Sequence, residues 1–118
     1  MPTWTSWQSF VPSIVRRATR NAGVYEIALD GRRWRYVVGW SSTIYYGLSN
    51  SGIRGRLETH LGGRGNATVY DFLRSGEPLK VRWWSTVHDP RPIECRLLDR
   101  FEQQFGERPL GNIQGCAI

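Results

Sequence analysis

Arg56 and His60 are the residues whose types and spacing first suggest chemistry. They stand four apart in IRGRLETHL, residues 53–61, and this stretch is expected to be helical, so the two side chains share one face. Glu58 and Thr59 lie off that face and do not neutralise it. An arginine and a histidine placed together in this way suit a bound phosphate group. The alternative is an exposed pair of solvated cations.

Glu94 is the acidic candidate. It precedes by one turn the apolar stripe Leu97, Leu98 and Phe101 of a helix expected from about Ile93 to Phe105, so its side chain points the way the core stripe points. A carboxylate in that position is costly unless something pairs with it or binds it. It is either a metal ligand or catalytic group, or a carboxylate that the helix dipole stabilises by roughly 0.3–1 kcal/mol.

The charge of the chain favours an anionic partner. Sixteen basic residues oppose ten acidic ones, giving a net charge of +6 and a pI of about 10.0. Nearly all the basic residues are arginines, with Lys80 the single lysine, and arginine can hold phosphate through two parallel hydrogen bonds. Nucleic acid is therefore the first expected partner, and a role in solubility alone is the alternative. No run of eighteen apolar residues exists, so no membrane partner is expected.

Cys95 and Cys116 are the only cysteines. They show no metal-binding spacing, and the N-terminus lacks the basic and apolar regions of a secretory signal. These features predict a cytoplasmic protein with both thiols reduced.

The remaining elements follow from periodicity and turn signals. Helices are expected at about 13–20, 53–61, 67–75 and 93–105, and strands at 24–29, 34–40, 44–49 and 81–87. Ser13, Asn66 and Asp89 are the expected helix caps. Asp30-Gly31 suggests a hairpin turn, so residues 24–48 are predicted to form an antiparallel meander. The order of elements indicates an α+β fold with a small antiparallel sheet of three to four strands flanked by helices.

Five short motifs occur in a particular order. They are GVY at 23–25, YYG at 45–47, R-x-x-x-H at 56–60, Glu94, and PLGN at 109–112. This set resembles the GIY-YIG nuclease family, with Val24 in place of the isoleucine of the first motif. The resemblance covers about residues 22–113, so the chain is expected to be a single GIY-YIG-like domain with a core at 23–113 and an N-terminal extension at 1–22. It implies a three-stranded antiparallel sheet flanked by helices and a metal-dependent nuclease activity.

The resemblance also implies catalytic roles. Glu94 would hold Mg²⁺ or Mn²⁺, and Arg56 would lie against the scissile phosphate. Tyr25 would be the general base or would orient the attacking water, with Tyr45 and His60 supporting the attack or tuning Tyr25. A phenol with a pKa near 10 becomes a usable base only where positive charge favours the phenolate, and Arg56, His60 and the metal are expected to supply that charge.

Four further residues are candidates for contact with nucleic acid. Asn112 would anchor the active site or touch the substrate backbone, and Arg64, in the loop GGRGN, Arg54 and Lys80 would grip phosphates. No separate recognition domain is expected beside the core. The protein is therefore expected to act alone with modest sequence selectivity, as a monomer, or to form a homodimer.

The second motif has a rival position. Twenty residues separate Tyr25 from Tyr45, whereas the family joins its two motif strands by a short hairpin. Tyr36, followed by Val37-Val38-Gly39, is the other candidate. Tyr45 is preferred because Gly47 then lies nine residues before the arginine of the helix, near the usual distance.

The sequence thus predicts a metal-dependent endonuclease that hydrolyses phosphodiester bonds of nucleic acid, with DNA favoured. A non-catalytic nucleic-acid-binding module of the same fold is one alternative, and a protein-interaction domain with a basic face is another. The intact set of tyrosine, arginine, histidine and glutamate argues against both, because binding alone needs no buried carboxylate facing a phosphate.

Overall fold

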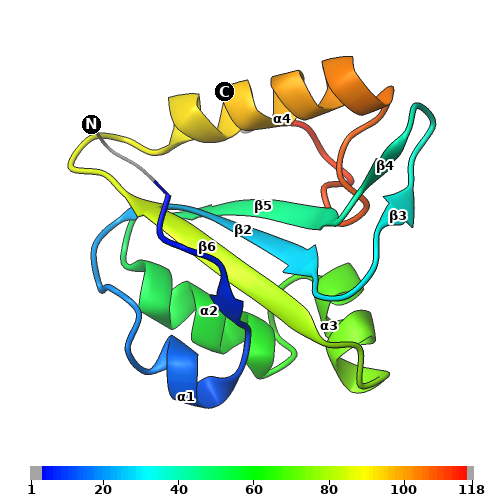
Figure 1. The fold of residues 1–118 in the computed structure, drawn as a ribbon. Helices are drawn as coiled ribbons and strands as arrows, with labels where there is room; N and C mark the ends of the chain where they lie inside the picture. The colour runs from blue at the N-terminus through cyan, green and yellow to red at the C-terminus, as the bar shows by residue number, and fades with distance from the viewer. Residues whose placement is uncertain (1–3, 117–118) are drawn as a thin grey trace.

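An antiparallel sheet lies between two layers of helices (Figure 1). The computed structural model describes residues 4–116. The sheet has the strand order β1-β6-β2-β5, with β1 at Gln8–Ser9, β2 at Gly23–Leu29, β5 at Thr43–Ser49 and β6 at Leu79–Ser85. Helix α4 (Arg91–Phe105) covers one face, and α1 (Pro12–Val15), α2 (Ile53–Leu61) and α3 (Ala67–Arg74) cover the other. The predicted α+β class with a small antiparallel sheet is therefore confirmed.

The predicted three-stranded meander is wrong in its middle strand. Strand β2 pairs directly with β5 on one edge and with β6 on the other. Both edges of β2 are then filled, so the segment between β2 and β5 has no place in the sheet. It forms a separate two-stranded hairpin, β3 (Trp34–Arg35) with β4 (Trp40–Ser41), that stands beside the C-terminal end of α4 (Figure 1).

The N-terminal segment is part of the sheet, and its helix is shorter than predicted. Strand β1 pairs with β6, with Gln8 opposite Val81. Helix α1 has four residues and ends at Val15, whereas the sequence predicts a helix through Arg20, and Ser13 does not cap it. Pro12 occupies the first turn, where its lack of an N–H and its fixed φ are favourable, so Ser13 falls inside the helix and beyond the capping position.

The other helices form close to where local signals place them. Asn66 caps α3, accepting a hydrogen bond from the Val69 N–H at 3.1 Å. Asp89, the predicted cap of the last helix, accepts one from the Arg91 N–H at 3.0 Å, but the N-cap of α4 is Pro90, and the helix begins two residues before the predicted start. Helix α4, with fifteen residues, is the longest of those described. Within residues 4–116, no helix has the length and apolar character needed to cross a membrane.

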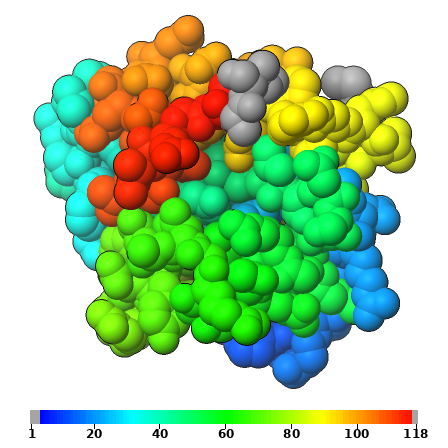
Figure 2. Space-filling model, turned by 180° about the vertical axis from the view of Figure 1, so that it is seen from behind, coloured from blue at the N-terminus to red at the C-terminus, as the bar shows by residue number. Residues whose placement is uncertain are grey.

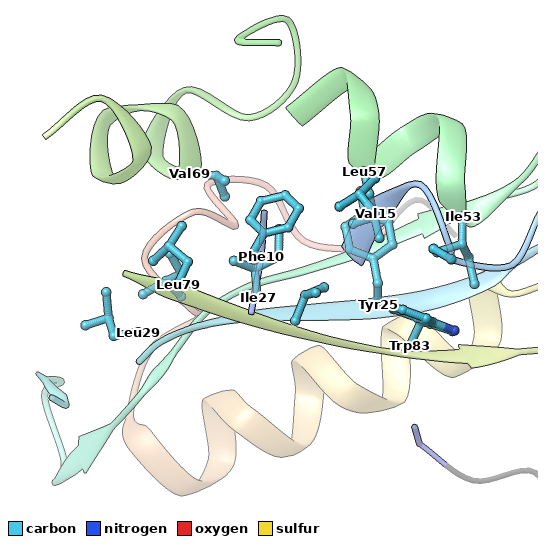
Figure 3. Packing of buried hydrophobic residues seen from close by; sticks show 13 residues of the cluster. Phe10, Val15, Tyr25, Ile27, Leu29, Ile53, Leu57, Val69, Leu79 and Trp83 are labelled. Atoms are coloured by element: carbon cyan, nitrogen blue, oxygen red, sulfur yellow. The ribbon is translucent and has the colours of Figure 1, made fainter. Parts of the chain in front are cut away.

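Alternation along β2 and β5 sends neighbouring side chains to different layers. Tyr25 and Ile27 point toward α2, where they pack with Ile53 and Leu57 (Figure 3). Tyr46 points the other way, into a second apolar cluster under α4. The sheet therefore has a core on each face, and the α2 face holds the first motif tyrosine.

The two cysteines form a disulfide, so the expectation of reduced thiols is wrong. Cys95 lies in the first turns of α4, and Cys116 lies in the C-terminal tail, with 5.0 Å between their Cα atoms. The sequence separation of 21 residues hides this proximity, because it arises only when the tail turns back along the sheet.

Candidate active site

Strand register brings the two motif tyrosines together. Tyr25 on β2 lies opposite Gly47 on β5. Tyr45 stands two residues before Gly47 and shares its face, which makes it the diagonal neighbour of Tyr25, with 6.2 Å between the two ring centroids. A Cβ at Gly47 would overlap the Tyr25 ring. The glycine of the YYG motif therefore provides the space in which the Tyr25 ring lies.

His60 is fully buried on the inner face of α2 and contacts Tyr25. Its Nε2 lies 2.7 Å from the Tyr25 hydroxyl, and its Nδ1 accepts a hydrogen bond from the Asn66 backbone N–H at 3.0 Å. Burial, aided by the nearby charge of Arg56, lowers the pKa of His60 to about 4, so the ring is neutral at pH 7. Because a backbone N–H can only donate, the single ring proton sits on Nε2 and is donated to the Tyr25 oxygen.

The ionisation of the two tyrosines is set by opposing effects. Burial raises the pKa of Tyr25 well above its usual value of 10, and it also raises the pKa of Tyr45. Arg56, whose side chain is exposed on α2, acts in the opposite direction on both. Burial prevails, so both phenols are protonated at neutral pH. Arg56 supplies the expected positive field, whereas neutral His60 contributes a hydrogen bond and no charge.

Glu94 faces the same group of side chains from α4. Its side chain is half-buried, and burial raises its pKa. Its negative charge is near enough to raise the pKa of Tyr25 and of Tyr45, although α4 lies on the opposite face of the sheet from α2. Within residues 4–116, the Glu94 carboxylate has no ion pair within 4.0 Å.

The Glu94 side chain lines a hollow of about 390 Å³, here called the Glu94 hollow. Its lining residues come from β5, α3, α4 and the C-terminal tail: Tyr45, Asn66, Glu94, Leu98, Gly111, Asn112, Ile113, Gln114 and Gly115. Figure 2 shows this side of the molecule, where α4 and the tail lie on one side of β5 and α2 and α3 lie on the other. Tyr25 and His60 are buried behind Tyr45.

One carboxylate, and no cage of ligands, is available for a metal. Among residues 4–116, no group of three or more His, Cys, Asp or Glu side chains could enclose an ion. Mg²⁺ is commonly held by one or two carboxylates, with water and substrate phosphate oxygens completing its shell. The unpaired, half-buried carboxylate of Glu94 at an open hollow fits such an ion, and it fits Mn²⁺ through the same oxygen donors.

Asn112 and Asn66 attach the tail to the site. The Asn112 side chain accepts a hydrogen bond from the Tyr46 N–H at 2.9 Å and donates one to the Tyr46 carbonyl at 2.8 Å. Of the two roles expected for Asn112, this geometry is that of an anchor. The Asn66 side chain donates to the Gly111 carbonyl at 2.8 Å. Sequence reasoning identified Asn66 only as a cap, because its link to the tail spans 45 residues.

The other basic candidates and the rival tyrosine lie outside the Glu94 hollow. Arg64 is exposed on the loop after α2, and Lys80 on β6 places its Nζ 4.8 Å from the ring centroid of Trp7. Arg54 donates from its Nε to the Ala18 carbonyl at 2.7 Å, on the α1 side of α2. Tyr36 belongs to the α4 core and donates its hydroxyl to the Thr43 carbonyl at 2.7 Å.

Comparison with known proteins adds no relative. No protein-family model, no curated protein and no solved structure matches this chain. Any functional conclusion therefore rests on the ordered motifs and on the geometry described above.

Proposed function

We propose that this chain is a metal-dependent endonuclease of the GIY-YIG type that hydrolyses phosphodiester bonds of nucleic acid, with DNA as the favoured substrate. One observation carries the proposal. Five residues from β2, β5, α2 and α4 lie close enough to influence one another's pKa values, namely Tyr25, Tyr45, Arg56, His60 and Glu94, and two of them, Tyr45 and Glu94, line the open Glu94 hollow. A core built only for stability would leave no carboxylate half-buried and unpaired there.

Arg56 is the phosphate-binding group in this proposal. Its guanidinium is exposed and lies close enough to both phenols for its charge to offset part of the increase in pKa that burial causes. Such a group can donate two parallel hydrogen bonds to the non-bridging oxygens of a phosphodiester. Because its charge is already in place, it stabilises the charge that develops on those oxygens in the transition state.

Tyr25 is the group that accepts a proton from the attacking water. His60 cannot take the Tyr25 proton, because its Nε2 already carries one and its Nδ1 is occupied by Asn66. The Tyr25 proton must first pass to solvent by way of the hollow that Tyr45 lines, and only then can Tyr25 take a proton from the attacking water. The resulting phenolate would then be stabilised by the His60 N–H and by the charge of Arg56. His60 is thus a positioning residue for the Tyr25 oxygen.

Glu94 is the residue that would hold the divalent ion. Once bound there, the ion would neutralise part of the charge on the phosphate and on the leaving oxygen. The protein contributes the position of the carboxylate, which the tail and Tyr45 border. Burial raises the pKa of Glu94, and the charge of a bound cation would lower it again. The cation would thereby favour the ionised carboxylate that a metal requires as its ligand.

The decisive experiment compares Glu94→Gln with Glu102→Gln, an exposed carboxylate on the same helix. Labelled single-stranded, duplex and branched DNA and RNA are incubated with each protein in Mg²⁺, Mn²⁺ or EDTA, and the cut ends are sequenced. Wild type and Glu102→Gln are expected to cut at least one DNA substrate when metal is present. Glu94→Gln is expected to lose activity by about 100-fold or more, the scale of losing a transition-state contact.

Cutting that persists in EDTA or in Glu94→Gln would refute the metal-dependent mechanism. A salt-sensitive complex with nucleic acid and no cutting would support the binding module instead. If the protein neither cuts nor binds nucleic acid, a protein-interaction domain would be the remaining explanation.

A further inference from the structure

A second hollow lies on the other flank of α2, between that helix and the segment that follows α1. It has a volume of about 510 Å³ and is here called the α1–α2 hollow. Its lining is dominated by arginine: Arg16, Arg20, Ser51, Gly52, Arg54, Gly55 and Glu58. None of these residues lines the Glu94 hollow.

The three arginines of this hollow lack compensating charge. Within residues 4–116, none of Arg16, Arg20 and Arg54 has a carboxylate within 4.0 Å, and Glu58 is the one acidic residue among the lining. Like charges that converge on one hollow repel each other. A bound anion would remove that repulsion, and a phosphate oxygen suits the planar donors of arginine better than a chloride ion does.

Arg54 is held in place to serve such an anion. Its Nε donates to the Ala18 carbonyl at 2.7 Å, which fixes the plane of the guanidinium. Among the described residues its Nη atoms have no hydrogen-bond partner. Arg16 and Arg20 are exposed on the segment that follows α1 and approach the hollow from the opposite wall.

Arginine side chains, rather than the start of α2, make this hollow a site. The Ile53 N–H donates to the Asn21 carbonyl and the Arg54 N–H donates to the Thr19 carbonyl, so the first helix amides are already satisfied. The surface between the arginines is open, because apart from the backbone of α2 itself and the two residues next to Gly55, no heavy atom lies within 4 Å of the place where a Cβ at Gly55 would stand. A phosphate oxygen can therefore approach the helix closely at that point.

The same helix presents Arg56 to the site of Tyr25. Arg54 and Arg56 are two residues apart, so they leave α2 from different flanks. A helix with its side chains is about 10–12 Å across, a width that a nucleic-acid backbone spans within a few nucleotides. A backbone lying across the exposed side of α2 would therefore reach both arginines.

We propose that the α1–α2 hollow binds a backbone phosphate of the nucleic-acid substrate, a few nucleotides from the phosphate held by Arg56. This inference rests on the proposed nuclease function and extends it to the path of the substrate. It gives the segment before β2 a role in binding, because that segment supplies two of the three arginines.

The test measures binding without cutting. The dissociation constant of a fluorescein-labelled 20-base-pair duplex is measured by anisotropy in EDTA, at several NaCl concentrations from 50 to 300 mM. Wild type is compared with Arg16→Ala/Arg20→Ala. The matched control is Arg96→Ala/Arg100→Ala, which removes two exposed arginines that are also four apart, on α4. Melting temperatures establish that every variant is folded.

The Arg16/Arg20 variant is expected to bind about fivefold more weakly than the control variant at 150 mM salt. Its slope of log affinity against log salt is expected to be smaller by about 0.9, the value for one lost phosphate contact. Equal affinity and equal slope for the two variants would overturn the phosphate site while leaving the nuclease proposal intact. A reduced slope in a protein that cuts nothing in Mg²⁺ or Mn²⁺ would support the phosphate site and refute the nuclease. Failure of wild type to bind the duplex at 50 mM salt would overturn the phosphate site, whereas the nuclease proposal is decided separately by the cleavage panel.

Discussion

The buried, neutral state of His60 predicts a specific dependence of stability on pH. Its pKa is lowered from 6.5 to about 4, so between these values the unfolded chain binds a proton that the folded chain does not. Stability therefore falls as pH decreases through this window. Each pKa unit corresponds to about 1.4 kcal/mol, which gives a full loss of about 3 kcal/mol. At pH 4.5 about 2.5 kcal/mol of it should be reached.

The assay is urea unfolding followed by tryptophan fluorescence at pH 7.0, 6.0, 5.0 and 4.5. His60→Gln removes the titrating group, so the comparison with wild type cancels the carboxylates that titrate in the same range. The variant should be less stable at pH 7, and its deficit should shrink by about 2–3 kcal/mol at pH 4.5. The control is His88→Gln, because His88 is exposed, and it should follow the wild-type curve. A deficit for His60→Gln that stays constant across the window would refute a neutral, hydrogen-bonded His60.

Three further outcomes follow from the site. Gly47→Ala should destabilise the protein by about 1–3 kcal/mol in urea unfolding, because its Cβ overlaps the Tyr25 ring; Gly55→Ala, with open space around it, should instead be neutral or stabilising by up to about 1 kcal/mol. Tyr25→Phe should abolish cleavage and cost about 1–3 kcal/mol of stability, since the His60 N–H loses its acceptor; unchanged turnover would exclude Tyr25 as the base. Cys95→Ser should lower stability by about 3 kcal/mol, as expected for a closed loop of this length, and an equal unfolding midpoint with and without the disulfide would contradict this.

Local signals were sufficient to predict the helices around the site. The Gly62-Gly63 pair marks the end of α2, Asn66 caps α3, and Gly106 ends α4 with a φ of 78°. Each of these signals acts through backbone groups only a few residues away. Local signals also predict that Arg56 and His60 lie on one helix, α2. The part of the candidate site that α2 supplies could therefore be predicted from the spacing of these two residues.

Strand pairing could not be predicted in the same way, because it is decided by competition between distant partners. Asp30-Gly31 does turn the chain, but β6 takes the edge of β2 that the expected hairpin strand would have used. Tyr36 consequently joins the α4 core, and Tyr45 becomes the neighbour of Tyr25. The position of the ring proton on His60 could not be predicted from the sequence either. It depends on the Asn66 backbone N–H, which the loop after α2 brings next to the ring.

The C-terminal tail covers the edge of the sheet at β5 and also lines the candidate site. Strand β5 ends the sheet, and an uncovered edge invites pairing with other chains. The Gly111 N–H donates to the Ile44 carbonyl at 2.8 Å, and Asn112 bonds both backbone groups of Tyr46. These contacts cover the edge next to Tyr45, and they also build the wall opposite Glu94. Because the disulfide joins the end of the tail to α4 beside Glu94, a change that frees the tail must expose the β5 edge and displace the wall of the hollow together.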